Sequence, residues 1–155
     1  MNILQTQCKL IIIRTILFSH FRPIIHLEYS EPCWLLLYPE GTRFSAAKHA
    51  ESMEFAKAND LPKLKYLLLP RPKGFHEITS NLHGTSVKAV YDCTFLIQDD
   101  FDVPITNWLK RKPTPMKMAC TRIELDSIPT DPELSKKYIY NLFKEKVCFI
   151  NCFLI

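Results

Sequence analysis

A continuous apolar run that stops at a turn and leads directly into a helix is the feature that most restricts the fold of this sequence. The run covers residues 34–38 and is ended by Pro39 and Gly41. An unbroken apolar run of this length is typical of a strand buried on both faces. Ser45 then offers an N-cap oxygen to a helix predicted over residues 46–58. Such a strand–turn–helix unit indicates an α/β domain, in which ligand sites lie at the carboxyl ends of strands.

Further strands and helices alternate along the rest of the chain. We predict strands over residues 87–97 and 116–125, the second at a sheet edge, and helices over residues 75–82 and 105–112. The segment Thr130-Asp131-Pro132-Glu133 offers a capping side chain, a proline in the first turn and an acid beside it, and so predicts the start of a last helix that runs to about Val147. Its apolar face is predicted to be formed by Leu134, Tyr138, Leu142 and Phe143. The alternation predicts a mostly parallel sheet flanked by helices.

The composition is that of a globular chain of 155 residues, with 47% apolar and 23% charged residues. This length is sufficient for one domain. The net charge of +4 fits an anionic substrate or an anionic membrane face, and it is too small and dispersed to indicate nucleic-acid binding. Two apolar stretches, residues 10–18 and 147–155, are shorter than the roughly 20 residues that a membrane-spanning helix needs, although shallow contact with a membrane surface remains open.

The six cysteines do not form a recognisable metal or disulfide pattern. They are scattered, with no C-x-x-C pair and no histidine at ligand spacing. We therefore predict no metal site and no disulfide framework, and expect free thiols in a reducing compartment.

The turn after the first predicted strand carries residues suited to binding a phosphate. Gly41 allows a tight turn and close approach of a ligand, and Arg43 offers a planar fork of donors that matches a phosphate. Thr42 adds a hydroxyl, and the following helix adds N–H groups at its N-terminus. Glu40 could hold Arg43 or accept a hydrogen bond from a substrate hydroxyl. The alternative is an ordinary turn closed by a surface pair of Glu40 and Arg43.

Several motifs in order give the chain a specific family resemblance. The turn Tyr38-Pro39-Glu40-Gly41-Thr42-Arg43 resembles the third sequence block of the glycerolipid acyltransferases. From about Trp34 to Lys146, further stretches resemble the gamma and delta types of 1-acylglycerol-3-phosphate acyltransferase. In chain order they are Lys48, His49, Ser52, Met53 and Glu54, then Leu61-Pro62-Lys63-Leu64-Lys65-Tyr66, Leu68-Leu69-Pro70-Arg71, Lys73-Gly74-Phe75, Ala89-Val90-Tyr91-Asp92 with Thr94, and Ile123 to Pro129.

This resemblance implies transfer of a fatty acyl group from acyl-CoA to lysophosphatidic acid, giving phosphatidic acid. It implies that Glu40, Gly41, Thr42 and Arg43 bind the acceptor's phosphate, and that no metal or bound cofactor is needed, because acyl-CoA is a co-substrate. The expected partners are a lysophospholipid, acyl-CoA and a membrane surface, with the endoplasmic reticulum membrane as the location. Arg71 and Lys73 are candidates for contacts with CoA phosphates or a headgroup, or they are a solvated loop.

The family's H-x-x-x-x-D block, whose histidine is the general base, has no counterpart in this sequence. The nearest spacings pair His26 with Glu31 and His49 with Glu54, and neither stands where the block is expected. We therefore assign no catalytic residue and expect a part of the family's chain. Residues 1–32 form a divergent N-terminal segment, residues 33–147 the C-terminal part of the acyltransferase domain, and residues 148–155 a short apolar tail. The alternative function is that of an inactive relative which binds phosphate or lipid without turnover.

Overall fold

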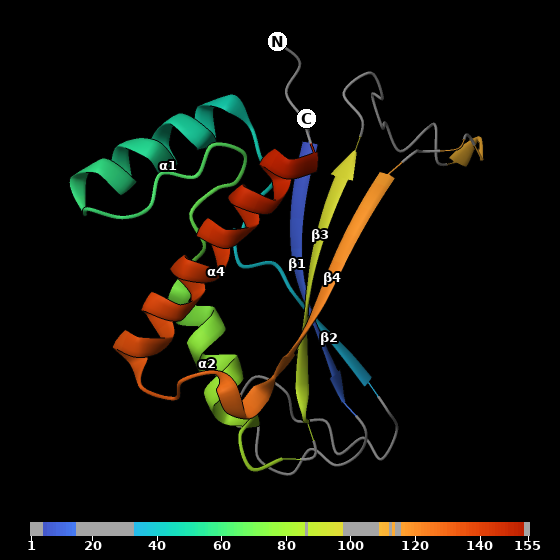
Figure 1. The fold of residues 1–155 in the computed structure, drawn as a ribbon, viewed down its shortest axis with the longest axis vertical. Coiled ribbons are helices and arrows are strands. Elements are labelled where there is room, and N and C mark those ends of the chain that lie inside the picture. The colour runs from blue at the N-terminus through green and yellow to red at the C-terminus, as the bar shows by residue number, and fades with distance from the viewer. Residues whose placement is uncertain are drawn as a thin grey trace.

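The computed structural model describes residues 5–14, 33–85, 87–97, 109–111, 113 and 116–153. Figure 1 shows a two-layer arrangement in which the helices lie on one side of a twisted sheet. Helices α2 and α4 lie side by side. The elements, in chain order, are β1 (Gln5–Arg14), β2 (Cys33–Leu37), α1 (Ala46–Ala58), α2 (Pro72–Leu82), β3 (Ala89–Ile97), β4 (Met116–Glu124), the 3₁₀ turn η1 (Leu125–Ser127) and α4 (Pro132–Phe153).

The four described strands form a sheet in the order β2-β1-β3-β4, and all three strand pairs are antiparallel. The mixed α/β class is confirmed, whereas the prediction of a mostly parallel sheet is wrong. Because β2 and β3 both run antiparallel to β1, they run in the same direction, as expected for strands joined through helices. They do not pair, however, since β1 lies between them. That strand comes from residues 1–32, the segment in which the sequence shows no clear pattern.

Strand β2 is an edge strand and is not buried on both faces as predicted. Leu36 and Tyr38 remain 44% and 50% exposed, while Leu35 and Leu37 pack against the core. The alternation arises because the helices lie on one side of the sheet (Figure 1) and successive side chains of a strand point to opposite faces. Strand β4, at the opposite edge, fits the predicted edge strand.

The capping side chains locate two helix starts correctly. Ser45 Oγ accepts a hydrogen bond from the Lys48 backbone N–H at 3.3 Å, and α1 covers the predicted range. Asp131 Oδ1 accepts from the backbone N–H groups of Glu133 and Leu134 at the start of α4. Helix α4 continues to Phe153, beyond the predicted end near Val147. Most of the helix predicted over residues 105–112 lies outside the described residues.

The core lies between the sheet and helices α2 and α4. Phe75 from α2 and Ile139, Phe143 and Ile150 from α4 are almost completely buried. Leu134 is 57% exposed, so its predicted place on the buried face of α4 is wrong. The buried face instead contains Ser135 and Lys146 among its apolar residues.

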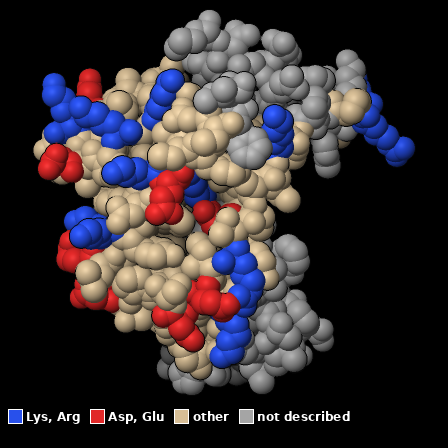
Figure 2. Space-filling model, viewed as in Figure 1, with Lys and Arg blue, Asp and Glu red and all other residues tan. Residues whose placement is uncertain are grey.

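No described helix is long and apolar enough to span a bilayer. On the face of the molecule shown in Figure 2, basic and acidic side chains are interspersed. The division of the chain into residues 1–32, 33–147 and 148–155 stays a prediction.

Candidate functional site

The turn that links β2 to α1 presents the predicted phosphate-binding residues. Gly41 has a φ of 70°, in the left-handed region that favours glycine. Its backbone N–H donates to the Tyr38 carbonyl at 3.0 Å, which closes the turn. Thr42 and Arg43 follow with exposed side chains. Among the described residues, no ion pair involves Arg43. The Arg43 guanidinium is therefore positioned to meet a ligand from solvent.

Glu40 is buried, unlike the surface carboxylate of an ordinary turn. Its side chain is among the buried charged groups, with the residue only 8% exposed. Glu40 Oε2 accepts a hydrogen bond from the Leu68 backbone N–H at 2.9 Å, which joins segments 28 residues apart. Because a carboxylate bonded to a buried N–H is a strong acceptor, Glu40 fixes the turn against the loop of residues 61–71.

Helix α1 holds the same loop through two polar contacts. His49 Nε2 lies 2.8 Å from the Leu64 carbonyl oxygen, which can only accept, so Nε2 carries the proton. Ser52 Oγ accepts from the Leu69 backbone N–H at 2.9 Å. His49 Nε2 is thus used within the fold, and the interpretation that this histidine is no general base stays a prediction. His26 lies outside the described residues.

Arg71 lies directly against the Gly41 turn. A Cβ atom built on Gly41 would lie 2.8 Å from Arg71 Nε and 2.9 Å from its Cδ. The Arg71 backbone N–H donates to the Pro39 carbonyl at 2.7 Å, which holds the two segments together. The structure therefore brings together Gly41 and Arg71, two residues that the sequence assigned to separate contacts. The absence of a side chain at Gly41 makes room for this guanidinium.

The start of helix α2 lies at the same place and has the electrostatics of an anion site. Arg71 is its N-cap residue but gives no capping hydrogen bond, and the first turn contains no acidic residue. Lys73 is exposed in that turn. Positive side chains are unfavourable at a helix N-terminus, because the helix dipole is positive there too. An anion bound at this place would be stabilised by the side chains and by the dipole. Helix α1, in contrast, is already capped by Ser45.

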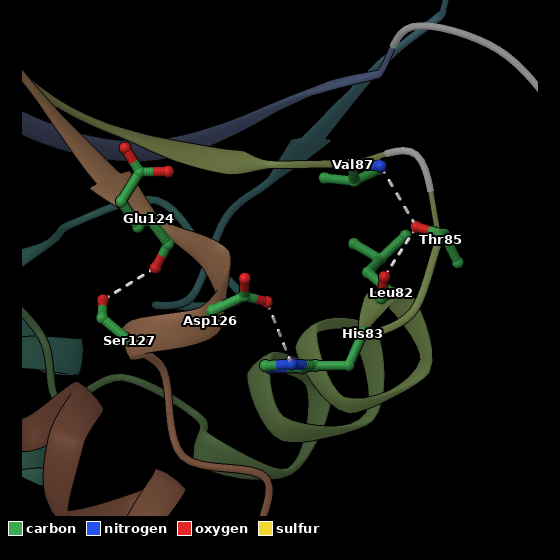
Figure 3. Close-up of polar contacts among 7 residues, drawn as sticks. All are labelled: Leu82, His83, Thr85, Val87, Glu124, Asp126 and Ser127. Atoms are coloured by element: carbon green, nitrogen blue, oxygen red, sulfur yellow. Dashed lines mark hydrogen bonds and ion pairs between the residues drawn. The ribbon is translucent and has the colours of Figure 1, made fainter.

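One histidine–carboxylate contact was not visible from sequence spacing. His83 Nδ1 lies 3.8 Å from Asp126 Oδ1, where the end of α2 meets η1 (Figure 3). His83 Nε2 is enclosed without a hydrogen-bond partner, so it presents no open nitrogen to a substrate hydroxyl. It also lies at the opposite end of the 11-residue helix α2 from Arg71, roughly 16 Å along the axis. His83 and Asp126 are therefore no replacement for the family's catalytic block.

A second polar group lies within the core. Lys146 and Asp92 form a buried ion pair, with side chains 5% and 8% exposed, beside a cavity of about 280 Å³ between β3, β4 and α4. Burial raises the pKa of the Asp92 carboxyl, and the Lys146 ammonium opposes that rise.

Among the described residues, no group of three or more histidine, cysteine or acidic side chains is arranged to hold a metal ion.

Three glycine-to-alanine variants test the contact between Gly41 and Arg71. Gly41→Ala and Gly84→Ala are each expected to lower the free energy of unfolding by about 1–2 kcal/mol, since both glycines have positive φ. Only Gly41→Ala should also weaken phosphate binding, because its Cβ displaces the Arg71 side chain. Gly74→Ala, within α2 and with open space around it, should stabilise the fold by about 0.5–1 kcal/mol.

Urea denaturation and calorimetric titration with inorganic phosphate measure the two effects separately. Gly84→Ala is the matched control, because a Cβ there meets no atom within 4 Å. Equal phosphate affinity in the Gly41 and Gly84 variants would show that the position of Arg71 does not matter for anion binding.

Comparison with known proteins identifies relatives over most of this chain. The human 1-acyl-sn-glycerol-3-phosphate acyltransferase gamma is 42% identical over 119 residues, which are 77% of this chain and 31% of the relative. The human delta type is 37% identical over 122 residues, 79% of this chain and 32% of the relative. The bovine delta type is 35% identical over 127 residues, 81% of this chain and 33% of the relative.

The chain thus spans about a third of the length of the relatives it matches. No family model and no solved structure matches the sequence. The identity to both types nevertheless confirms the resemblance of the motifs. Over these residues the chain is a homologue of the gamma and delta 1-acyl-sn-glycerol-3-phosphate acyltransferases.

Proposed function

We propose that this chain supplies the acceptor-binding part of an acyltransferase of phospholipid biosynthesis, which moves a fatty acyl group from acyl-CoA to lysophosphatidic acid and so forms phosphatidic acid. The observation that carries the proposal is the placement of Arg71 against Gly41, at a helix start with no acidic residue. The names of the relatives support the class of reaction. A lysophospholipid is then the ligand, acyl-CoA the donor and the endoplasmic reticulum membrane the location.

The acceptor's phosphate is held by charges from two segments. Arg43 and Arg71 provide guanidinium donors, and the first-turn N–H groups of α2 and the helix dipole add to the attraction. Thr42 donates its hydroxyl, and Lys73 binds a second phosphate of the CoA donor or of a neighbouring headgroup. Glu40 supports this arrangement by fixing the loop that carries Arg71, which fits its hydrogen bond to the Leu68 N–H. Fixed charges bind an anion well because little reorganisation is needed.

The second candidate is a protein that binds the lipid without transferring an acyl group. It is favoured by the sequence, in which no histidine has an aspartate at the H-x-x-x-x-D spacing. Two of the described histidines support it too, since His49 Nε2 is bonded to the Leu64 carbonyl and His83 Nε2 is enclosed. Both candidates use the same phosphate site, so they differ only in turnover.

Arg43→Ala is expected to weaken binding of a short-chain lysophosphatidic acid about 10- to 100-fold. The reason is that a hydrogen bond to a charged group contributes about 1.5–3 kcal/mol. Lys48→Ala is the matched control: it removes one positive charge nearby, from a surface pair with Glu51, and should leave the affinity unchanged. Isothermal titration calorimetry measures both. An equal loss of affinity in the two variants would mean that the lipid is attracted by the net charge of the chain and not bound at a specific site.

Turnover separates the two candidates. Labelled oleoyl-CoA and lysophosphatidic acid are incubated with the chain, and phosphatidic acid is measured, with circular dichroism to check the fold. Product formation that is lost in Arg43→Ala supports the enzyme. Binding that depends on Arg43 but gives no product supports the non-catalytic relative.

A further inference from the structure

Two cysteines face each other across the pair of strands β3 and β4. Cys93 and Cys120 are direct partners in the antiparallel register. The Cys93 thiol donates a hydrogen bond to Cys120 Sγ, with 3.1 Å between the two sulfur atoms. Both are free thiols in this structure, and Cys93 is buried while Cys120 is exposed. The pair lies outside the candidate phosphate site and takes no part in the proposed acyl transfer.

The backbone already holds these cysteines at a spacing that a disulfide accepts. Directly opposed residues in antiparallel strands have Cα atoms about 4.5–5.5 Å apart, and disulfides bridge Cα atoms about 4.4–6.8 Å apart. Closing the 3.1 Å gap to a bond of roughly 2.05 Å needs only small side-chain rotations. We propose that Cys93 and Cys120 form an oxidisable dithiol site that a small-molecule disulfide converts to a cross-strand disulfide.

The reaction is a pair of thiol–disulfide exchanges. Exposed Cys120, as thiolate, attacks one sulfur of glutathione disulfide; the sulfur–sulfur bond breaks, and one glutathione leaves and takes up a proton. Cys93, as thiolate, then attacks Cys120 Sγ in the mixed disulfide and releases the second glutathione. The two protein thiols are oxidised and one glutathione disulfide is reduced to two thiols, so atoms and electrons balance.

The different environments of the two thiols fix their order of reaction. Cys120 can be reached from solvent, whereas Cys93 is only 2% exposed and cannot meet a bulky oxidant. Burial, followed by the hydrogen bond to Cys120, raises the pKa of Cys93 to about 12. Since only the thiolate attacks, ring closure by Cys93 is the slow step at neutral pH. Once formed, the disulfide ties edge strand β4 to β3, its neighbour in the sheet.

The test uses the full chain with Cys148→Ser and Cys152→Ser, which removes two exposed thiols on α4. After incubation with glutathione disulfide, the thiols are blocked by alkylation and the protein is digested. The expected result is loss of two hydrogens from the intact mass and one linked peptide that joins Cys93 to Cys120. Hydrogen exchange in β4 should also slow. Linkage through Cys8 or Cys33, or no linkage at all, would overturn the proposal.

Two further variants check the order of attack. With Cys93→Ala, glutathione should stay attached to Cys120, since no second thiol displaces it. Cys120→Ser is a substitution at an exposed position. In this variant neither the glutathione adduct at residue 120 nor the linked peptide should form. If Cys93→Ala still loses two hydrogens, another pair of cysteines is oxidised and the assignment is wrong.

Discussion

Replacing Lys146 by methionine is expected to lower the free energy of unfolding by about 3–5 kcal/mol. Lys146 is only 5% exposed and pairs with Asp92, which is almost as deeply buried. Methionine keeps a chain of similar length but leaves the Asp92 carboxylate without its counter-ion inside the core. Breaking a buried pair from one side is costly because the remaining charge keeps its desolvation penalty. Urea denaturation followed by circular dichroism measures the loss.

The loss should also depend on pH. Burial raises the pKa of Asp92, so this carboxyl takes up a proton more readily in the folded chain than in the unfolded one. Its contribution to stability is therefore present at acidic pH and is lost as the pH rises through the folded pKa. Without Lys146, which lowers that pKa, the fall in stability should extend further toward neutral pH. Lys146→Met should thus resemble the parent chain most closely in acid.

A double variant provides the control. Asp92→Val together with Lys146→Met removes both charges and should recover most of the stability, because apolar pairs of similar volume replace buried ion pairs at little cost. The two single variants and the double variant form a mutant cycle. If the double variant loses the sum of the two single losses, the pair does not act as a unit and the expectation fails.

The same pair shows why the buried face of α4 could be predicted only in part from sequence. Apolar spacing selected Leu134, Tyr138, Leu142 and Phe143. The structure buries Phe143, packs Tyr138 and Leu142 against the core as partly buried residues, and leaves Leu134 exposed. The buried face also contains Ser135 and Lys146, and Asp92 compensates the charge of the lysine. Asp92 lies 54 residues away in β3. No local pattern contains that partner, and a lysine is almost never fully buried unless it is paired.

Features set by local chemistry were predictable, and features set by distant pairing were not. Ser45 and Asp131 located the starts of α1 and α4 because a cap acts within its own helical turn. Whether neighbouring strands are parallel or antiparallel depended on β1, which lies between β2 and β3. No local signal in the sequence indicates that position. At the candidate site, the sequence identified Gly41 and Arg71 by residue type. It could not predict their contact, which depends on how the loop after α1 folds back.

Phe143→Ala is expected to lower the free energy of unfolding by about 3–5 kcal/mol, the range for removing a buried aromatic ring. Phe143 has no exposed surface and packs in the cluster between α2, α4 and the sheet. The Lys146 ammonium also lies 5.1 Å from the centre of its ring, so the variant removes a favourable contact of the buried charge as well. Leu134→Ala on the same helix is the control. Because Leu134 is 57% exposed, its loss should change stability by less than about 0.5 kcal/mol. Chemical denaturation of both variants measures the two losses. Comparable losses would mean that Leu134 supports the fold as much as Phe143 does, contrary to its exposure in the structure.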